Sequence, residues 1–260
     1  MEETNISEKD GKKAARAAKK EQKRLEKEQK KRKKQEKQRR LLFPANKKGR
    51  HVMHFMNVLR VIFYPIHALI FPFKLHGYKK VGKGAYIYVC NHYGLLDVFF
   101  PAHTTWEGVH FIAKEEVMHA PVLGYVARRV GVIGAARDGS DVRSIMDSLK
   151  VLKNGEKIVI FPEGTRNRKP GDEFLPFHGG AAMLAIKSRT PVIPLVICDR
   201  PRPFRRVHVM IGEPMELSDY YGRKLTPEEY GEADKLLENR LYELRDEFRA
   251  SRRKKGAEKR

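Results

Sequence analysis

Residues 85–97 read AYIYVCNHYGLLD, a short apolar run that leads directly into a cluster of polar side chains. The apolar half is rich in β-branched and aromatic residues and carries no charge, which predicts a strand buried on both faces. Similar runs recur at residues 110–113, 131–135, 157–161, 192–197 and 206–211. Because stretches of helical spacing separate these runs, we expect an α/β fold with a mainly parallel sheet flanked by helices.

Positive charge is concentrated at the N-terminal end of the chain. The formal net charge of the 260 residues is +22, and residues 1–50 alone hold 20 Lys and Arg against 8 Asp and Glu. This stretch lacks the apolar positions of a coiled coil, so we expect a disordered or solvated helical tail. A second interpretation is attraction to anionic lipid headgroups, at about 1 kcal/mol per basic residue near the surface.

Residues 51–77 are apolar and aromatic, and Pro65 and Pro72 are expected to interrupt any helix there. No apolar run reaches the roughly 20 residues that a membrane-spanning helix needs. Basic residues flank the segment, which favours an interfacial or re-entrant membrane anchor. The alternative is a helix docked on the protein's own core.

The chain is therefore expected to divide into four segments. Residues 1–50 are the basic tail, 51–77 the anchor, 78–215 an α/β domain, and 216–260 an amphipathic helix with a basic tail. The apolar positions of that last helix are Leu236, Leu237, Leu241 and Leu244, at helical spacing.

The cellular location follows from the same features. Cys90 and Cys198 lie far apart, each in an apolar run, so we expect two buried free thiols and a reducing compartment. The N-terminus is charged throughout and does not resemble a signal peptide. With the basic tail and the anchor, this predicts a peripheral or monotopic protein on the cytoplasmic face of the cell membrane.

The first polar cluster contains His92 and Asp97, directly after the strand that ends near Cys90. α/β proteins place their sites beyond the carboxyl ends of strands. Gly94 permits a sharp turn, so the loop can bring the imidazole and the carboxylate together. Asp97 would then accept a hydrogen bond from one ring nitrogen and leave the other as a base. Alone, this spacing is weak evidence, and a solvated histidine with an Asp near a helix start is the default interpretation.

A second cluster, FPEGTR at residues 161–166, follows the apolar run 157–161. Gly164 lets backbone N–H groups approach an anion, and Thr165 offers a hydroxyl. The guanidinium of Arg166 matches a phosphate in two hydrogen bonds. The simpler alternative is a basic surface turn in which Glu163 and Arg166 pair with each other.

Together these clusters resemble the signatures of the glycerolipid acyltransferase family, whose simplest members are bacterial lysophosphatidic acid acyltransferases. Asn91-His92 with Asp97 matches the N-H-x4-D block, and residues 161–166 match the F-P-E-G-T-R block. Two further blocks agree in order, one with Lys114 and Arg137 and one with Pro194. The resemblance covers about residues 78–215, which it identifies as the catalytic domain.

The resemblance implies a mechanism. His92 would take a proton from the acceptor hydroxyl, and Asp97 would orient the imidazole. Arg166, Lys114 and Arg137 would hold the acceptor phosphate. The remaining positions would shape that pocket (Glu163, Gly164, Thr165) or support the site (Asn91, Gly94, Pro194). No metal or cofactor is needed, since acyl-CoA or acyl carrier protein is a co-substrate.

The expected activity is acylation of lysophosphatidic acid to phosphatidic acid in phospholipid biosynthesis. Glycerol-3-phosphate or another lysolipid is an alternative acceptor. The expected partners are the lipid acceptor, the acyl thioester donor and an anionic membrane surface. Acyl carrier protein is a further partner if it, and not CoA, carries the acyl chain. A basic nucleic-acid- or lipid-binding protein without catalysis is the alternative from another class. Nucleic acid is disfavoured, because the chain has no recognisable binding module and the two motif blocks would be unexplained.

Overall fold

The computed structural model describes residues 21–22, 47–78, 81–135, 142–169, 171, 173–178 and 180–257. The chain divides into two compact units, Met1–Pro44 and Ala45–Arg260. Almost all of the predicted basic tail lies outside the described residues. The architecture below is that of the second unit.

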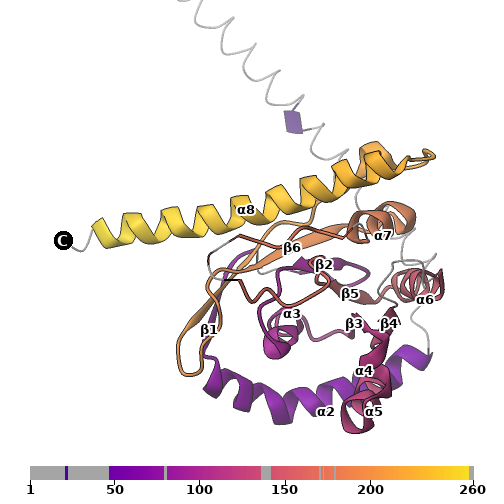
Figure 1. The fold of residues 1–260 in the computed structure, drawn as a ribbon, viewed down its shortest axis with the longest axis horizontal. Helices are drawn as coiled ribbons and strands as arrows, with labels where there is room; N and C mark the ends of the chain where they lie inside the picture. The colour runs from indigo at the N-terminus through magenta and orange to yellow at the C-terminus, as the bar shows by residue number, and fades with distance from the viewer. Residues whose placement is uncertain are drawn as a thin grey trace, which may run out of the picture. The chain divides into compact units, whose positions relative to one another are not determined.

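A seven-stranded sheet forms the centre of this unit, in the order β1-β7-β6-β2-β5-β3-β4 (Figure 1). The strands are β1 (Phe73–Gly77), β2 (Ile87–Cys90), β3 (Val109–Lys114), β4 (Ile133–Ala135), β5 (Lys157–Ile160), β6 (Val192–Ile197) and β7 (Val207–Ile211). All neighbours pair in parallel except β6 and β7, which are antiparallel. The expected α/β fold with a mainly parallel sheet is therefore confirmed.

Helices cover both faces of the sheet. They are α2 (Lys47–Ile70), α3 (Phe99–Ala102), α4 (Glu115–His119), α5 (Pro121–Arg129), α6 (Val142–Lys153), α7 (Ala181–Ser188) and α8 (Pro227–Ala257). Figure 1 shows α7 and α8 on one face and α2 and α3 on the other. Two hydrophobic clusters fill the layers, one with Leu237 and Ala185 and one with Phe100 and Val209. The apolar strands bury side chains in both, which explains their continuous apolar sequences.

The predicted strands after residue 85 all form, with bounds that differ by a few residues at most. Cys90 and Cys198 are buried free thiols, as expected. Strand β1 was not predicted, because Phe73–Gly77 was assigned to the anchor. It pairs in parallel with β7 and forms one edge of the sheet, so this segment belongs to the sheet of the α/β domain. Its sequence FKLHG is only half-buried and lacks the apolar signal of the central strands.

The expectation that Pro65 interrupts the helix is wrong, because α2 runs continuously through it. Proline removes the backbone hydrogen bond to the carbonyl four residues earlier, here that of Val61. Pro65 and Val61 both lie on the exposed face of α2, where an unpaired carbonyl is not trapped in the core. No described helix is long and apolar enough to cross a membrane.

The long C-terminal helix α8 packs against β6, β7 and α7. It runs from Pro227 to Ala257, within the segment 216–260 that was expected to hold an amphipathic helix. Leu237, Leu241 and Leu244 are buried in the core, whereas Leu236, expected beside them, is 47% exposed. A helix presents only one stripe to its neighbours, and Leu236 lies about 100° away from Leu237 around the axis.

This pair of leucines allows a matched test of how α8 contributes to stability. Leu237→Ala should lower the free energy of unfolding by about 2–5 kcal/mol, because it leaves a cavity in the core. Leu236→Ala makes the same chemical change on the exposed side and should alter it by no more than about 0.5 kcal/mol. Denaturant unfolding followed by circular dichroism measures both. Equal losses would show that α8 does not pack as described.

Candidate active site

The two motif loops emerge side by side from the sheet. Strands β2 and β5 are parallel neighbours, so their carboxyl ends lie at the same edge. His92 follows β2 and Glu163 follows β5. The backbone N–H of Asn167 donates to the carbonyl oxygen of His92 at 2.6 Å, which ties the loops together. Both motifs therefore lie at one edge of the sheet, beside each other.

The carboxylate of Asp97 reaches back to His92 through a short 3-10 helix, Leu95–Val98, that follows Gly94. Its Oδ2 lies 3.1 Å from Nδ1 of His92. The same oxygen accepts from the backbone N–H groups of Tyr93 at 2.5 Å and Gly94 at 2.7 Å. Asp97 is only 2% exposed, so these donors replace the water that a buried carboxylate loses.

This geometry selects a protonation pattern for His92. A carboxylate accepts only, so Nδ1 carries the proton and Nε2 on the opposite side of the ring keeps its lone pair. The ring stacks on Phe161, with 4.2 Å between centroids and 26° between planes. The imidazole is thus held in position and tautomer, and Nε2 can act as a base.

Glu163 is buried at the junction of the two loops. Its Oε1 accepts from the N–H of His92 and its Oε2 from the N–H of Leu175, both at 2.8 Å. Burial raises the pKa of this carboxyl, and the two backbone hydrogen bonds partly oppose that rise. The alternative in which Glu163 pairs with Arg166 is not what the structure shows, because both carboxylate oxygens bind backbone donors.

Asn91 and Pro194 connect β2 to its other neighbour, β6. The Nδ2 of Asn91 donates to the carbonyl of Ile197 at 3.1 Å, and its Oδ1 accepts from the N–H of Ile197 at 2.8 Å. Pro194 is buried in β6 opposite Val89 of β2. Both residues therefore hold the scaffold beneath the His92 loop and do not reach the open side of the site.

The residues expected to bind phosphate are exposed at the same edge. Gly164, Thr165 and Arg166 project beyond β5, and Lys114 ends the adjacent strand β3. Gly164 has φ of +60°, a conformation that other residues rarely adopt, so the turn requires glycine. Arg137 lies outside the described residues, and its place in the site stays a prediction.

A cavity of about 260 Å³ adjoins the His92–Asp97 pair. Its apolar lining includes Phe71 at the end of α2 and Phe100 on α3. Its polar lining includes Asp97, His67 and Arg200. The motifs did not indicate His67 or Arg200. Arg200 follows β6, which is a parallel neighbour of β2. Its position shortly after an expected strand was the one sequence signal that could have placed it at this edge.

A buried polar cluster underlies this cavity on the side of α2. His103 Nε2 lies 3.3 Å from His67 Nδ1. Burial lowers the pKa of His67 to about 4 and that of His103 to about 3, so both rings are neutral at neutral pH. Arg60 donates to the carbonyl of Glu107 at 3.1 Å. His103 is thus part of the packed interior beside α2.

Two further histidines, His110 and His119, lie away from the His92–Asp97 pair. His110 contacts the carbonyl of Gly131 and the carboxylate of Glu156, each at 2.7 Å. His119 is exposed and pairs with Glu115 at 3.5 Å. Across the described ranges, no three His, Cys, Asp or Glu side chains are grouped so that they could hold a metal ion.

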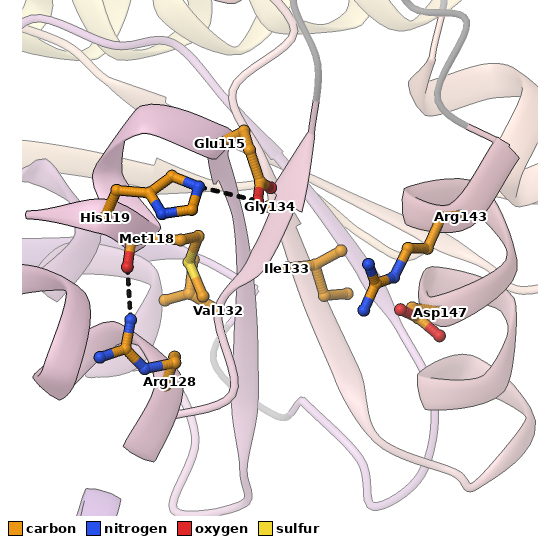
Figure 2. Close-up of a pocket in the computed structure, with 9 residues that line it drawn as sticks. All are labelled: Glu115, Met118, His119, Arg128, Val132, Ile133, Gly134, Arg143 and Asp147. Atoms are coloured by element: carbon orange, nitrogen blue, oxygen red, sulfur yellow. Dashed lines mark hydrogen bonds and ion pairs between the residues drawn. The ribbon is translucent and has the colours of Figure 1, made fainter.

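A larger cavity, of about 480 Å³, lies at the β4 edge of the sheet and does not include the His92–Asp97 pair (Figure 2). Arg128 and Arg143 approach it from α5 and α6, and Glu115 lies beside Gly134. Arg128 donates to the carbonyl of Met118. Acidic and basic groups are mixed here, and neither motif loop reaches this cavity.

Comparison with known proteins defines the class. Residues 72–198 match the profile of the family described as Acyltransferase. This part of the chain is therefore similar to an acyltransferase domain. Its start at residue 72 agrees with the inclusion of β1 in the sheet.

The names of individual relatives are more specific than the family description. A 1-acyl-sn-glycerol-3-phosphate acyltransferase of Helicobacter pylori is 34% identical over 133 residues, which are 48% of this chain and 55% of the relative. One from Bacillus subtilis is 27% identical over 145 residues, 52% of this chain and 69% of the relative. These matches confirm the resemblance to the glycerolipid acyltransferase family. The chain spans only 36% and 55% of the lengths of the relatives from Cocos nucifera and H. pylori.

A solved structure shows the same fold. The crystal structure of the 1-acyl-sn-glycerophosphate (LPA) acyltransferase PlsC from Thermotoga maritima superposes with a TM-score of 0.50 at 23% identity. The match covers 75% of this chain and 78% of the other.

Proposed function

We propose that the chain is an enzyme that transfers a fatty acyl group from a thioester to the free hydroxyl of lysophosphatidic acid, giving phosphatidic acid. The observation that carries this proposal is the 3.1 Å contact between His92 Nδ1 and Asp97 Oδ2 at the edge where the Arg166 loop emerges. It provides a base beside a basic side chain suited to phosphate. The names of the relatives, all acyltransferases of a lysophospholipid, support the choice of acceptor.

The chemistry uses the acceptor itself as nucleophile. Nε2 of His92 takes the hydroxyl proton as that oxygen attacks the thioester carbonyl. Asp97 stabilises the resulting imidazolium. Collapse of the tetrahedral intermediate breaks the carbon–sulfur bond, and the imidazolium returns the proton to the departing thiolate. No serine or cysteine nucleophile, metal or cofactor is required.

Arg166 and Lys114 are the described cations that we assign to the acceptor phosphate, with Arg137 as a third. Glu163 orders the loop that carries Arg166, while Gly164 and Thr165 shape its surface. Acyl-CoA and acyl carrier protein are both suitable donors. Glycerol-3-phosphate and other lysolipids remain alternative acceptors, since each can present an anionic phosphate to the same cations.

We further propose that α2 lies on an anionic membrane surface at the cytoplasmic face. One side of α2 packs on the core through Leu59 and His67. The opposite side exposes apolar residues, namely Val58, Val61, Ile62, Phe63, Tyr64, Ile66 and Leu69. Such a stripe is costly in water, and a bilayer interface would cover it. The loop that carries Asp97 and the helix α2 with His67 both border the 260 Å³ cavity, so a lipid at the surface of α2 would lie close to the base.

The first test removes the base. His92→Ala should lower turnover by about 10²–10⁴-fold with little change in thermal stability, because His92 is a partly exposed loop residue. Purified protein in detergent would be assayed with lysolipid acceptors and both donor types. His119→Ala, an exposed histidine on α4, is the matched control. Near-normal turnover by a folded His92→Ala protein would remove His92 from the mechanism.

The second test concerns the acceptor phosphate. Arg166→Ala should raise the KM for the acceptor about 10- to 100-fold, because a charge-assisted hydrogen bond is worth roughly 1.5–3 kcal/mol. Arg166→Lys should restore only part of the loss, since an ammonium does not reproduce the guanidinium geometry. Steady-state kinetics with each substrate varied in turn separates the effects. A rise confined to the donor's KM would contradict this assignment.

The third test separates the two membrane contributions. Ile66→Asp with Leu69→Asp charges the exposed stripe and should release the protein from anionic vesicles at every salt concentration, because burial of apolar surface is not screened. Deleting residues 1–45 should weaken binding mainly at low salt, since charges are screened over about 8 Å at physiological ionic strength.

Vesicle flotation across a salt series measures both variants. Val142→Asp with Met146→Asp places the same charges on exposed positions of α6 and is the control. If the α2 variant floated like the control, the membrane contact would lie elsewhere.

A further inference from the structure

Arg200 stands just beyond the carboxyl end of β6, next to the strand that leads into His92. Its backbone is well anchored, because the side-chain amide of Asn91 bonds both backbone groups of Ile197, three residues earlier. The side chain lines the cavity that adjoins Asp97. No part of the proposed chemistry uses it.

The guanidinium contacts two different loops at once. Nη1 donates to the carbonyl of Asn167 at 2.9 Å, and Nη2 donates to the carbonyl of Lys169 at 2.7 Å. The guanidinium carbon lies over the ring of Tyr93, 4.9 Å from the ring centroid. The N–H groups of the guanidinium therefore hold the loop after β5, and its contact with Tyr93 holds the loop after β2.

Both contacts lead directly to the His92–Asp97 pair. The N–H of Asn167 donates to the carbonyl of His92, and the N–H of Tyr93 donates to Oδ2 of Asp97. A guanidinium can use its edge and its face together, because its donors lie in the plane and its stacking surface lies above it. The ammonium of a lysine has no such plane.

We infer that Arg200 is a positioning residue that fixes the separation of the two motif loops and thereby the place of His92 Nε2. This inference rests on the proposed acyl transfer. A displacement of about 1 Å at a reacting group can cost 10²-fold in rate, so a residue that never contacts substrate can control turnover. The competing role is direct contact with the acceptor phosphate, since the cavity is open to Arg200.

The test compares Arg200→Ala, Arg200→Lys and the control Arg202→Ala, which removes an exposed arginine of the same connection. Arg200→Ala should lower kcat by about 10- to 100-fold and change the KM for the acceptor by no more than about threefold. Arg200→Lys should recover little of this loss, because it keeps the charge but not the plane. Arg202→Ala should behave like the unmodified protein.

Kinetics distinguishes the two roles. A raised KM for the acceptor with kcat preserved, and its recovery by Arg200→Lys, would mean that Arg200 binds phosphate, and would overturn the positioning role. Equal kinetics for Arg200→Ala and Arg202→Ala would overturn it as well.

Hydrogen exchange followed by mass spectrometry tests whether Arg200 holds the two motif loops together, without any assay of activity. Arg200→Ala should increase exchange in peptides that cover residues 91–97 and 162–169, and Arg202→Ala should not. Unchanged exchange in both regions would refute the positioning role of Arg200. If the unmodified protein transferred no acyl group to any acceptor, the proposed function would fail, and this measurement would still decide whether Arg200 joins the loops.

Discussion

The buried carboxylate of Glu163 is the contact on which the arrangement of the site depends. Each of its oxygens accepts one backbone N–H, from His92 on one side and Leu175 on the other. A carboxylate without partners would be expensive in this position, and burial does raise its pKa. The fold tolerates the group because both oxygens are used. The result is that a residue within the FPEGTR motif determines where the backbone of His92 lies.

The alternation of apolar runs and helical spacing was enough to predict the α/β class and the position of the site. The central strands are buried on both faces, and their continuous apolar sequences are hard to mistake. The rule that α/β proteins place their sites beyond the carboxyl ends of strands pointed to the loop of His92. The contact of Glu163 with the backbone of His92 did not follow, because a sequence does not reveal which way a side chain turns once a loop closes.

The structure differs from the prediction where the sequence pattern of an element is weak or mixed. Strand β1 buries only part of its surface, so FKLHG has neither a strict alternation nor an apolar run. The helix α2 carries apolar residues on two opposite sides for two different reasons, one for the core and one for its surroundings. The structure shows α2 docked on the core, and its exposed apolar side is compatible with the proposed membrane contact. His67, within its apolar run, faces inwards and is neutral at neutral pH.

The position of β1 gives the segment after α2 a second purpose. A strand at the edge of a sheet leaves a row of backbone N–H and C=O groups ready to pair with another chain. In this protein β1 covers that row on β7 along its whole length, from Phe73 opposite Val207 to Gly77 opposite Ile211. The new edge is short and half-exposed and carries Lys74, which discourages further pairing. A shortened chain starting after residue 77 would keep every motif residue, yet it would uncover β7 and invite self-association through the sheet.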